Sequence, residues 1–175
     1  MTSKKLQGIV DYIVTRGLLA IKENAKGERA KLDYLAIFSR SSSEYRELMQ
    51  TISKLGVEVD KKTNPTGHTF LLKAPLNTSA GSLPLLKIRK PDPTRPQRGA
   101  PDFKVANYKS FKKKYLVNGN NFTLMIRSGY EMMELKGKDV LVYFPNETLG
   151  DRIKISKAKQ NPRGVYSVHP SGVNL

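Results

Sequence analysis

The chain has 175 residues, 31 of them Lys or Arg and 15 Asp or Glu, and therefore a formal net charge of +16. This length suffices for one domain or for two small modules that share a core. The chain has no cysteine, which excludes disulfides, thiolate zinc sites, iron–sulfur clusters and thiol nucleophiles. The positive charge attracts polyanions, such as nucleic acid, anionic lipid or phosphorylated metabolites, or only keeps the protein in solution.

The N-terminal segment predicts a helix and no membrane segment. Apolar residues from Leu6 to Ile21 recur at helical spacing, so residues 4–22 predict an amphipathic helix that Gly17 weakens or breaks. No apolar run reaches the roughly 18 residues that a membrane span requires, and polar residues interrupt 6–20 too often for a secretory signal. We expect a cytoplasmic protein without a membrane partner, in which 1–31 form an N-terminal helix and linker.

Residues 32–90 predict a β-α-β-β-β module. A buried strand over 32–39 is followed by three serines and Glu44, the pattern of a helix start, and Gly56 marks the helix end. Shorter strand patterns then cover 57–61, 68–74 and 83–90, with turn residues at 64–67 and a loop over 75–81.

Residues 91–101 contain four prolines and predict an extended connection without regular structure.

The second half then repeats the β-α-β-β-β plan over 102–144. A strand at 102–105 precedes a helix with Tyr108, Phe111 and Tyr115 on its inner face, and strands follow at 122–127, 130–135 and 140–144. Residues 145–175 predict a basic C-terminal tail, partly disordered or lying on the surface.

These elements predict an α+β fold in which two β-α-β-β-β modules form a cupped mixed sheet, preceded by an amphipathic helix. Each module opens on a short motif, Leu32-Asp33-Tyr34-Leu35-Ala36-Ile37 in the first and Pro101-Asp102-Phe103-Lys104-Val105 in the second. The doubled plan and these motifs resemble the vicinal oxygen chelate superfamily, which includes glyoxalase I, extradiol dioxygenases and bleomycin-resistance proteins. The resemblance covers roughly 32–144 and implies a sheet with an inner cavity.

The resemblance also bears on a metal site. In metal-dependent members the ligands come from the first and last strands of each module. Here the resemblance puts Tyr34 and Phe103 where histidines are expected, and Lys87 and Tyr143 where glutamates are expected. None of these side chains is an ordinary ligand for a divalent ion. We therefore expect that the metal site is lost and that there is no cofactor.

A second register aligns residues 129–135 with the family's closing strand and keeps Glu134 as one ligand. Together with His68, it leaves open a glyoxalase-like metalloenzyme with an incomplete site, so the sequence does not decide whether the protein is an enzyme. His68 itself either faces the cup as an acid–base or donor group, or lies exposed beside a turn.

Basic residues gather around the proline-rich connection, and guanidinium groups bind carboxylate or phosphate in bidentate fashion. They predict an anion clamp beside a cup lined by tyrosines, or alternatively a solvated linker that pairs with Asp92 and Asp102. The candidate ligand-binding residues are Tyr34, His68, Lys87, Arg89, Arg95, Arg98 and Tyr143.

A second basic group lies on the predicted helix of the repeated module. Lys109, Lys112 and Lys113 are candidates for polyanion binding, although a solvated helix face is the more common role for such lysines.

The sequence contains no glycine-rich phosphate loop, nucleophile elbow or zinc-binding helix motif. The leading hypothesis is a metal-free protein that binds a small anionic molecule, or an accessory protein of glyoxalase-like fold. A basic nucleic-acid-associated protein is the alternative, and the metalloenzyme is the second. The oligomeric state is not predicted.

Overall fold

The computed structural model describes residues 1–59, 66–117 and 121–153. Most of the predicted tail and the end of the strand predicted at 57–61 lie outside these ranges. The first half of the chain contains α1 (Ser3–Asn24), β1 (Ala30–Phe38), α2 (Ser42–Leu55), β2 (Gly56–Glu58), β3 (Gly67–Thr78) and β4 (Gly81–Arg89). The second half contains β5 (Gly99–Val105), α3 (Tyr108–Tyr115), β6 (Phe122–Arg127), β7 (Tyr130–Gly137), β8 (Val140–Pro145) and α4 (Leu149–Arg152).

All eight of these strands form one mixed sheet in the order β2-β3-β4-β1-β5-β8-β7-β6. The order is symmetric about the β1–β5 pair, so each half of the sheet is one β-α-β-β-β module. Within a module the first strand is parallel to the last, β1 to β4 and β5 to β8. The two modules join within one chain through the antiparallel pairing of β1 with β5. The predicted α+β fold, with its doubled module and cupped mixed sheet, is confirmed.

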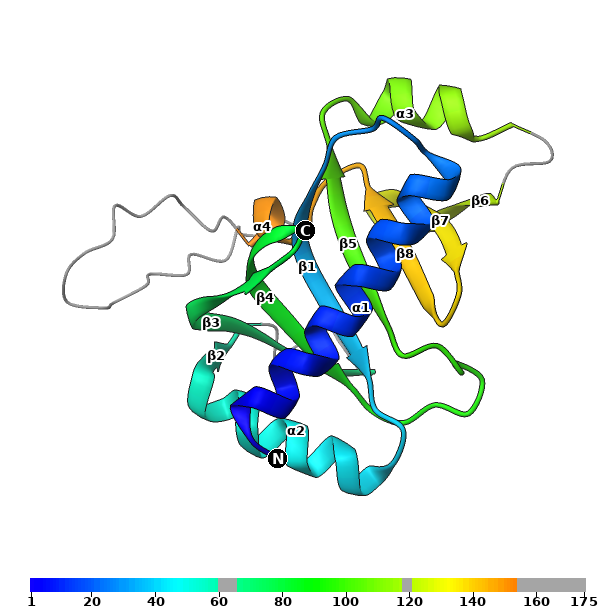
Figure 1. Ribbon diagram of the computed structural model, residues 1–175. Coiled ribbons are helices and arrows are strands. Elements are labelled where there is room, and N and C mark those ends of the chain that lie inside the picture. Colours follow the sequence, from blue (N-terminus) through cyan, green and yellow to red (C-terminus); the bar gives the residue numbers. More distant parts are fainter. Residues whose placement is uncertain (60–65, 118–120, 154–175) are drawn as a thin grey trace.

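The main core lies between the sheet and its helices. Figure 1 shows α1 crossing the front of the sheet, and the buried cluster on this side combines α1 residues with residues of α2, α3 and the strands. Phe103 and Phe144 are fully buried there, and the Phe144 ring packs against both Phe103 and Phe111 of α3. We call this side of the sheet the helix face and the opposite side the second face.

A β-bulge in β1 decides which of its residues point to each face. Leu32 lies opposite Phe103 and Tyr34 lies opposite Asp102, so Asp33 is one extra residue in β1. Such an insertion reverses the alternation of the strand beyond it. Leu32 therefore points to the helix face, whereas Tyr34, Ala36 and Phe38 contribute to a smaller apolar cluster on the second face.

Helix α1 is not broken at Gly17, where the absence of a side chain lets the helix approach β5 closely. Two other expectations about individual elements were wrong. Strand β3 continues through most of the predicted loop at 75–81, since Leu76, Asn77 and Thr78 pair with β4. Strand β5 begins at Gly99, inside the proline-rich connection, with Pro101 opposite Leu35.

Helix α4 was not predicted either, although Thr148 caps it by accepting a hydrogen bond from the Asp151 amide. None of the helices within residues 1–59, 66–117 and 121–153 is both long and apolar enough to cross a membrane.

The two glycines of α1 predict opposite effects of the same substitution. A Cβ atom at Gly17 would lie 2.7 Å from Cγ of Pro101 and 3.6 Å from the Phe103 ring, whereas a Cβ at Gly8 would meet nothing within 4 Å. We expect Gly17→Ala to lower the free energy of unfolding by about 1–3 kcal/mol through overpacking. Gly8→Ala should raise it by roughly 0.5–1 kcal/mol, because alanine favours helix. Urea unfolding of both variants measures the difference, and equal effects would contradict the close packing of Gly17 against Pro101.

Candidate functional site

The second face collects several of the candidate residues from neighbouring strands. Lys87 of β4 lies opposite Ala36 of β1, Tyr34 of β1 lies opposite Asp102 of β5, and Asp102 lies opposite Tyr143 of β8. Directly paired residues point to the same side of a sheet. Tyr34 and Tyr143 pack against the small apolar cluster of Ala36, Phe38, Ala100 and Leu141.

Phe103, for which the resemblance implied a ligand position, is fully buried on the helix face. Asp102 instead takes the place opposite Tyr34 on the second face. Asp102 is only 8% exposed, and its Oδ1 atom has no hydrogen-bond partner. Burial raises the pKa of Asp102 well above its ordinary value, and the nearby Asp33 carboxylate adds to this effect. Asp102 therefore retains its proton further up the pH scale than an exposed aspartate.

A second buried carboxyl group, Glu134 of β7, lies opposite Tyr143. The Tyr143 hydroxyl donates a hydrogen bond to Glu134. Burial raises the pKa of Tyr143 above its usual range, and the Glu134 charge and hydrogen bond add to the shift, while the positive charge of Arg95 opposes it. Tyr143 thus remains a neutral donor at physiological pH.

A buried cation completes the group. Lys87 is 5% exposed, and its Nζ donates a 2.9 Å hydrogen bond to Oγ1 of Thr66. Thr69 of β3 lies opposite Lys87, is almost fully buried, and its hydroxyl has no hydrogen-bond partner. Polar atoms buried in this way cost stability unless they are paired, so Thr69 and Asp102 mark a place where the fold itself leaves polar groups unsatisfied.

Helix α4 lies over part of this face. The amide of Gly150 donates a 3.1 Å hydrogen bond to Oδ2 of Asp33, and the Arg152 guanidinium stacks over the Tyr130 ring at 4.1 Å. The pKa of Asp33 is raised by burial, against the hydrogen bonds from Gly150 and Thr148. Arg152 also acts electrostatically on Asp102, so α4 contributes charge to the site.

The three candidate arginines divide between two places. Arg89 stacks over the Phe38 ring at 4.5 Å and pairs with Asp92 at 3.8 Å, and Arg95 acts electrostatically on Tyr143. Both therefore lie near the second face. Arg98 instead donates to both carboxylate oxygens of Glu44, at 2.7 and 3.2 Å, and to the carbonyl oxygen of Phe38 at 2.7 Å.

His68 does not join the group. It lies opposite Ile88, whose side chain belongs to the core on the helix face, and its Nδ1 atom contacts Oε1 of Glu58 at 2.6 Å. Glu134 points to the second face, so the sheet separates His68 from it. The pair expected for an incomplete metal site cannot bind one ion. Within the described ranges no three His, Asp or Glu side chains are grouped as a metal site requires.

The three candidate lysines of α3 differ in their surroundings. Lys112 pairs with Glu131 at 2.8 Å, whereas Lys109 and Lys113 are exposed. Phe111 and Tyr115 are buried in the core, where they cannot stack on bases.

Sequence reasoning identified Tyr34, Lys87 and Tyr143 but missed Asp102 and Thr69 as members of the group. The alternation of Asp102 and Lys104 with Phe103 and Val105 was a usable signal for Asp102. Thr69 had no such signal, because a threonine in a strand is ordinary.

The comparisons with known proteins show the fold alone. No protein-family model and no curated protein matches the chain. A solved structure from structural genomics, described as protein EC4020, is similar to it with a TM-score of 0.58 and 11% sequence identity. The match covers 80% of this chain and 86% of that chain.

The raised pKa of Asp102 predicts how the free energy of unfolding depends on pH. A carboxyl group whose pKa is higher in the folded state stabilises the protein below its unfolded pKa, near 3.8, and this contribution is lost as the pH rises through the folded pKa. Asp102→Asn keeps the shape and removes the titration. We expect its unfolding free energy to fall less than that of the wild type between about pH 4 and pH 7. Urea unfolding at several pH values measures this.

Asp151→Asn is the matched control. The hydrogen bond that Lys104 donates to Asp151 lowers the pKa of this carboxyl group. The carboxylate therefore stabilises the fold above its unfolded pKa, and that contribution is lost as the pH falls. The Asp151→Asn substitution should change the pH dependence of the unfolding free energy in the opposite direction to Asp102→Asn, and only weakly, because the Lys104–Asp151 pair is exposed. Identical pH profiles for the two variants would contradict the assignment of Asp102.

Proposed function

We propose that the protein is a metal-free binding or accessory protein of the vicinal oxygen chelate type, and that a small anionic molecule binds on the second face of its sheet. The carrying observation is the presence of two buried polar atoms without partners, Oδ1 of Asp102 and Oγ1 of Thr69, on the same face as the buried cation Lys87. A ligand that bonded to both atoms would remove the cost of burying them unpaired.

The chemistry of the group favours an anion. Lys87 supplies positive charge in a buried setting, where electrostatic attraction is stronger than in water. Burial raises the pKa of Asp102, so this carboxyl group repels an anionic oxygen less than an exposed aspartate does, and its protonated form donates a hydrogen bond. The Thr69 hydroxyl is a further donor. Arg89 and Arg95 add positive charge near the margin of the same face.

The apolar part of the ligand would contact Tyr34 and Phe38, which line the small cluster on this face. The proposal includes no reaction, and it also places the protein in the cytoplasm, since a chain without cysteine suits a reducing compartment.

Ligand stabilisation tests this function. In a thermal-shift panel of small carboxylic acids and phosphorylated metabolites, a true ligand at a hundred times its Kd stabilises by about 2.7 kcal/mol, which raises Tm by roughly 5–10 °C for a chain of this size. Lys87→Met keeps an unbranched side chain that is one heavy atom shorter and removes its charge, so the shift should disappear.

Lys90→Met is the control for this variant. Lys90 follows Lys87 three residues later and is exposed, so its substitution should leave the shift intact. If the same acids stabilise the Lys87→Met variant and the wild type equally, the proposed site is wrong. A shift produced by divalent cations and abolished by chelator would refute the metal-free proposal.

A further inference from the structure

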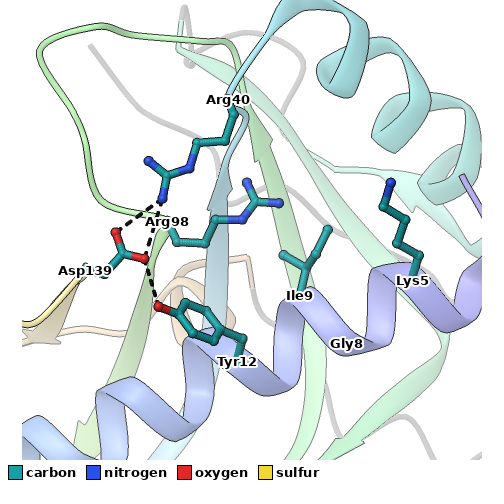
Figure 2. A pocket seen from close by; sticks show the side chains of 7 residues that line it. All are labelled: Lys5, Gly8, Ile9, Tyr12, Arg40, Arg98 and Asp139. Atoms are coloured by element: carbon teal, nitrogen blue, oxygen red, sulfur yellow. Dashed lines mark hydrogen bonds and ion pairs between the residues drawn. The ribbon is translucent and has the colours of Figure 1, made fainter.

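A separate pocket of about 520 Å³ lies on the helix side of the molecule, between α1 and the loops at the ends of β1, β5 and β7. Its volume falls within the roughly 300–1,000 Å³ of small-molecule sites. Figure 2 shows α1 forming one wall and two arginines facing it from the other. The lining residues are Lys5, Gly8, Ile9, Tyr12, Arg40, Arg98 and Asp139.

Gly8 is the observation that points to a ligand. A glycine inside a helix lowers its stability relative to alanine, so its presence calls for a reason. Close packing explains Gly17, where a Cβ atom would collide with Pro101, but it does not explain Gly8, where a Cβ atom would meet nothing within 4 Å. The missing side chain leaves room in the pocket.

The opposite wall is held in place by a network of ion pairs. Glu44 binds Arg98 through both oxygens and accepts a 2.6 Å hydrogen bond from the Arg40 amide. Asp139 accepts hydrogen bonds from the Tyr12 hydroxyl at 3.0 Å and from Arg40 at 3.2 Å, and its carbonyl oxygen accepts from the Arg98 amide at 2.7 Å. Guanidinium groups fixed in this way lose little entropy when they bind a ligand.

The charges of the wall opposite α1 balance each other, whereas Lys5 of α1 has no such partner. Arg98 pairs with Glu44, and Arg40 pairs with Asp139. No ion pair of the Lys5 side chain is present within residues 1–59, 66–117 and 121–153. Each guanidinium has five donors, so Arg40, half-exposed at 50%, has donors beyond those that it uses. Ile9 and the Tyr12 ring supply the apolar surface.

We propose that this pocket binds a small organic monoanion, a carboxylate attached to an apolar ring or chain, with the carboxylate between Lys5 and the arginines and the apolar part over Gly8 against Ile9 and Tyr12. The single unpaired cation matches one negative charge, and the planar guanidinium groups match a planar carboxylate. The site lies on the other side of the sheet from Asp102 and Lys87, and it is independent of the function proposed for that face.

Benzoate is the probe, and benzamide is its neutral counterpart of the same shape. Titration of the ¹⁵N-labelled full chain, followed by amide NMR shifts, should give saturable shifts at Gly8, Ile9 and Arg98. Benzamide should bind about fivefold more weakly or not at all, because it lacks the charge that Lys5 attracts. Equal affinities for the two probes would overturn the proposal.

Two variants of Gly8 locate the site. Gly8→Leu fills the pocket with a good helix former and should weaken benzoate binding more than about tenfold, because the added side chain occupies the ligand's space. Gly8→Ala adds one methyl group and also raises helix propensity, so a smaller loss of about two- to threefold would show that the loss follows side-chain volume and not helix propensity. Thermal unfolding verifies that both variants fold.

Lys5→Gln should weaken benzoate binding about two- to fivefold and reduce the salt dependence of binding, as expected for one exposed ion pair.

Saturable shifts confined to Ala36, Ala100 and Leu141, unchanged in Gly8→Leu, would overturn this inference and support the function proposed for the second face. Absence of any saturable shift at Gly8 would overturn it as well, while the Lys87 experiment would still decide the other site.

Discussion

The antiparallel pairing of β1 with β5 is the constraint on which the rest of the structure depends. It joins the two modules into one sheet at the centre of the strand order. We call this pair of strands the seam. Helix α1 crosses the seam (Figure 1), and Gly17 permits the contact of the helix with Pro101 in β5. The pairing links residues about 70 positions apart in the sequence, so the two modules become one domain only through a long-range contact.

The same seam generates both sites. On the second face, the bulge at Asp33 brings Tyr34 opposite Asp102, and the neighbouring strands β4 and β8 add Lys87 and Tyr143. At one end of the seam, β1 finishes where β5 starts. The amide of Phe38 therefore donates to the carbonyl oxygen of Arg98, and the Arg98 guanidinium returns a bond to the carbonyl oxygen of Phe38. That end of the seam forms one wall of the α1 pocket.

The candidate site could be predicted from the sequence only in part. Tyr34, Lys87 and Tyr143 were found because the doubled module indicates which strands come first and last. Alignment of the two opening motifs pairs Tyr34 with Phe103, since the extra residue in β1 has no marker in the sequence, whereas Asp102 lies opposite Tyr34 in the sheet. Proximity along the chain groups Arg98 with Arg89 and Arg95, but its partner Glu44 lies 54 residues away, in a pattern that indicates only a helix start.

The sequence by itself determined the repeated plan, most of the helices and strands, and the α+β class, because helical and strand periodicity and capping residues act over a few residues. Only the tertiary structure decided which side chains meet. The bulge at Asp33 reverses the direction of every side chain that follows it in β1. The sheet separates His68 from Glu134, and the pocket at Gly8 exists because three loops approach one helix. Such contacts depend on strand register and on segments far apart in the sequence, about which local sequence patterns carry no information.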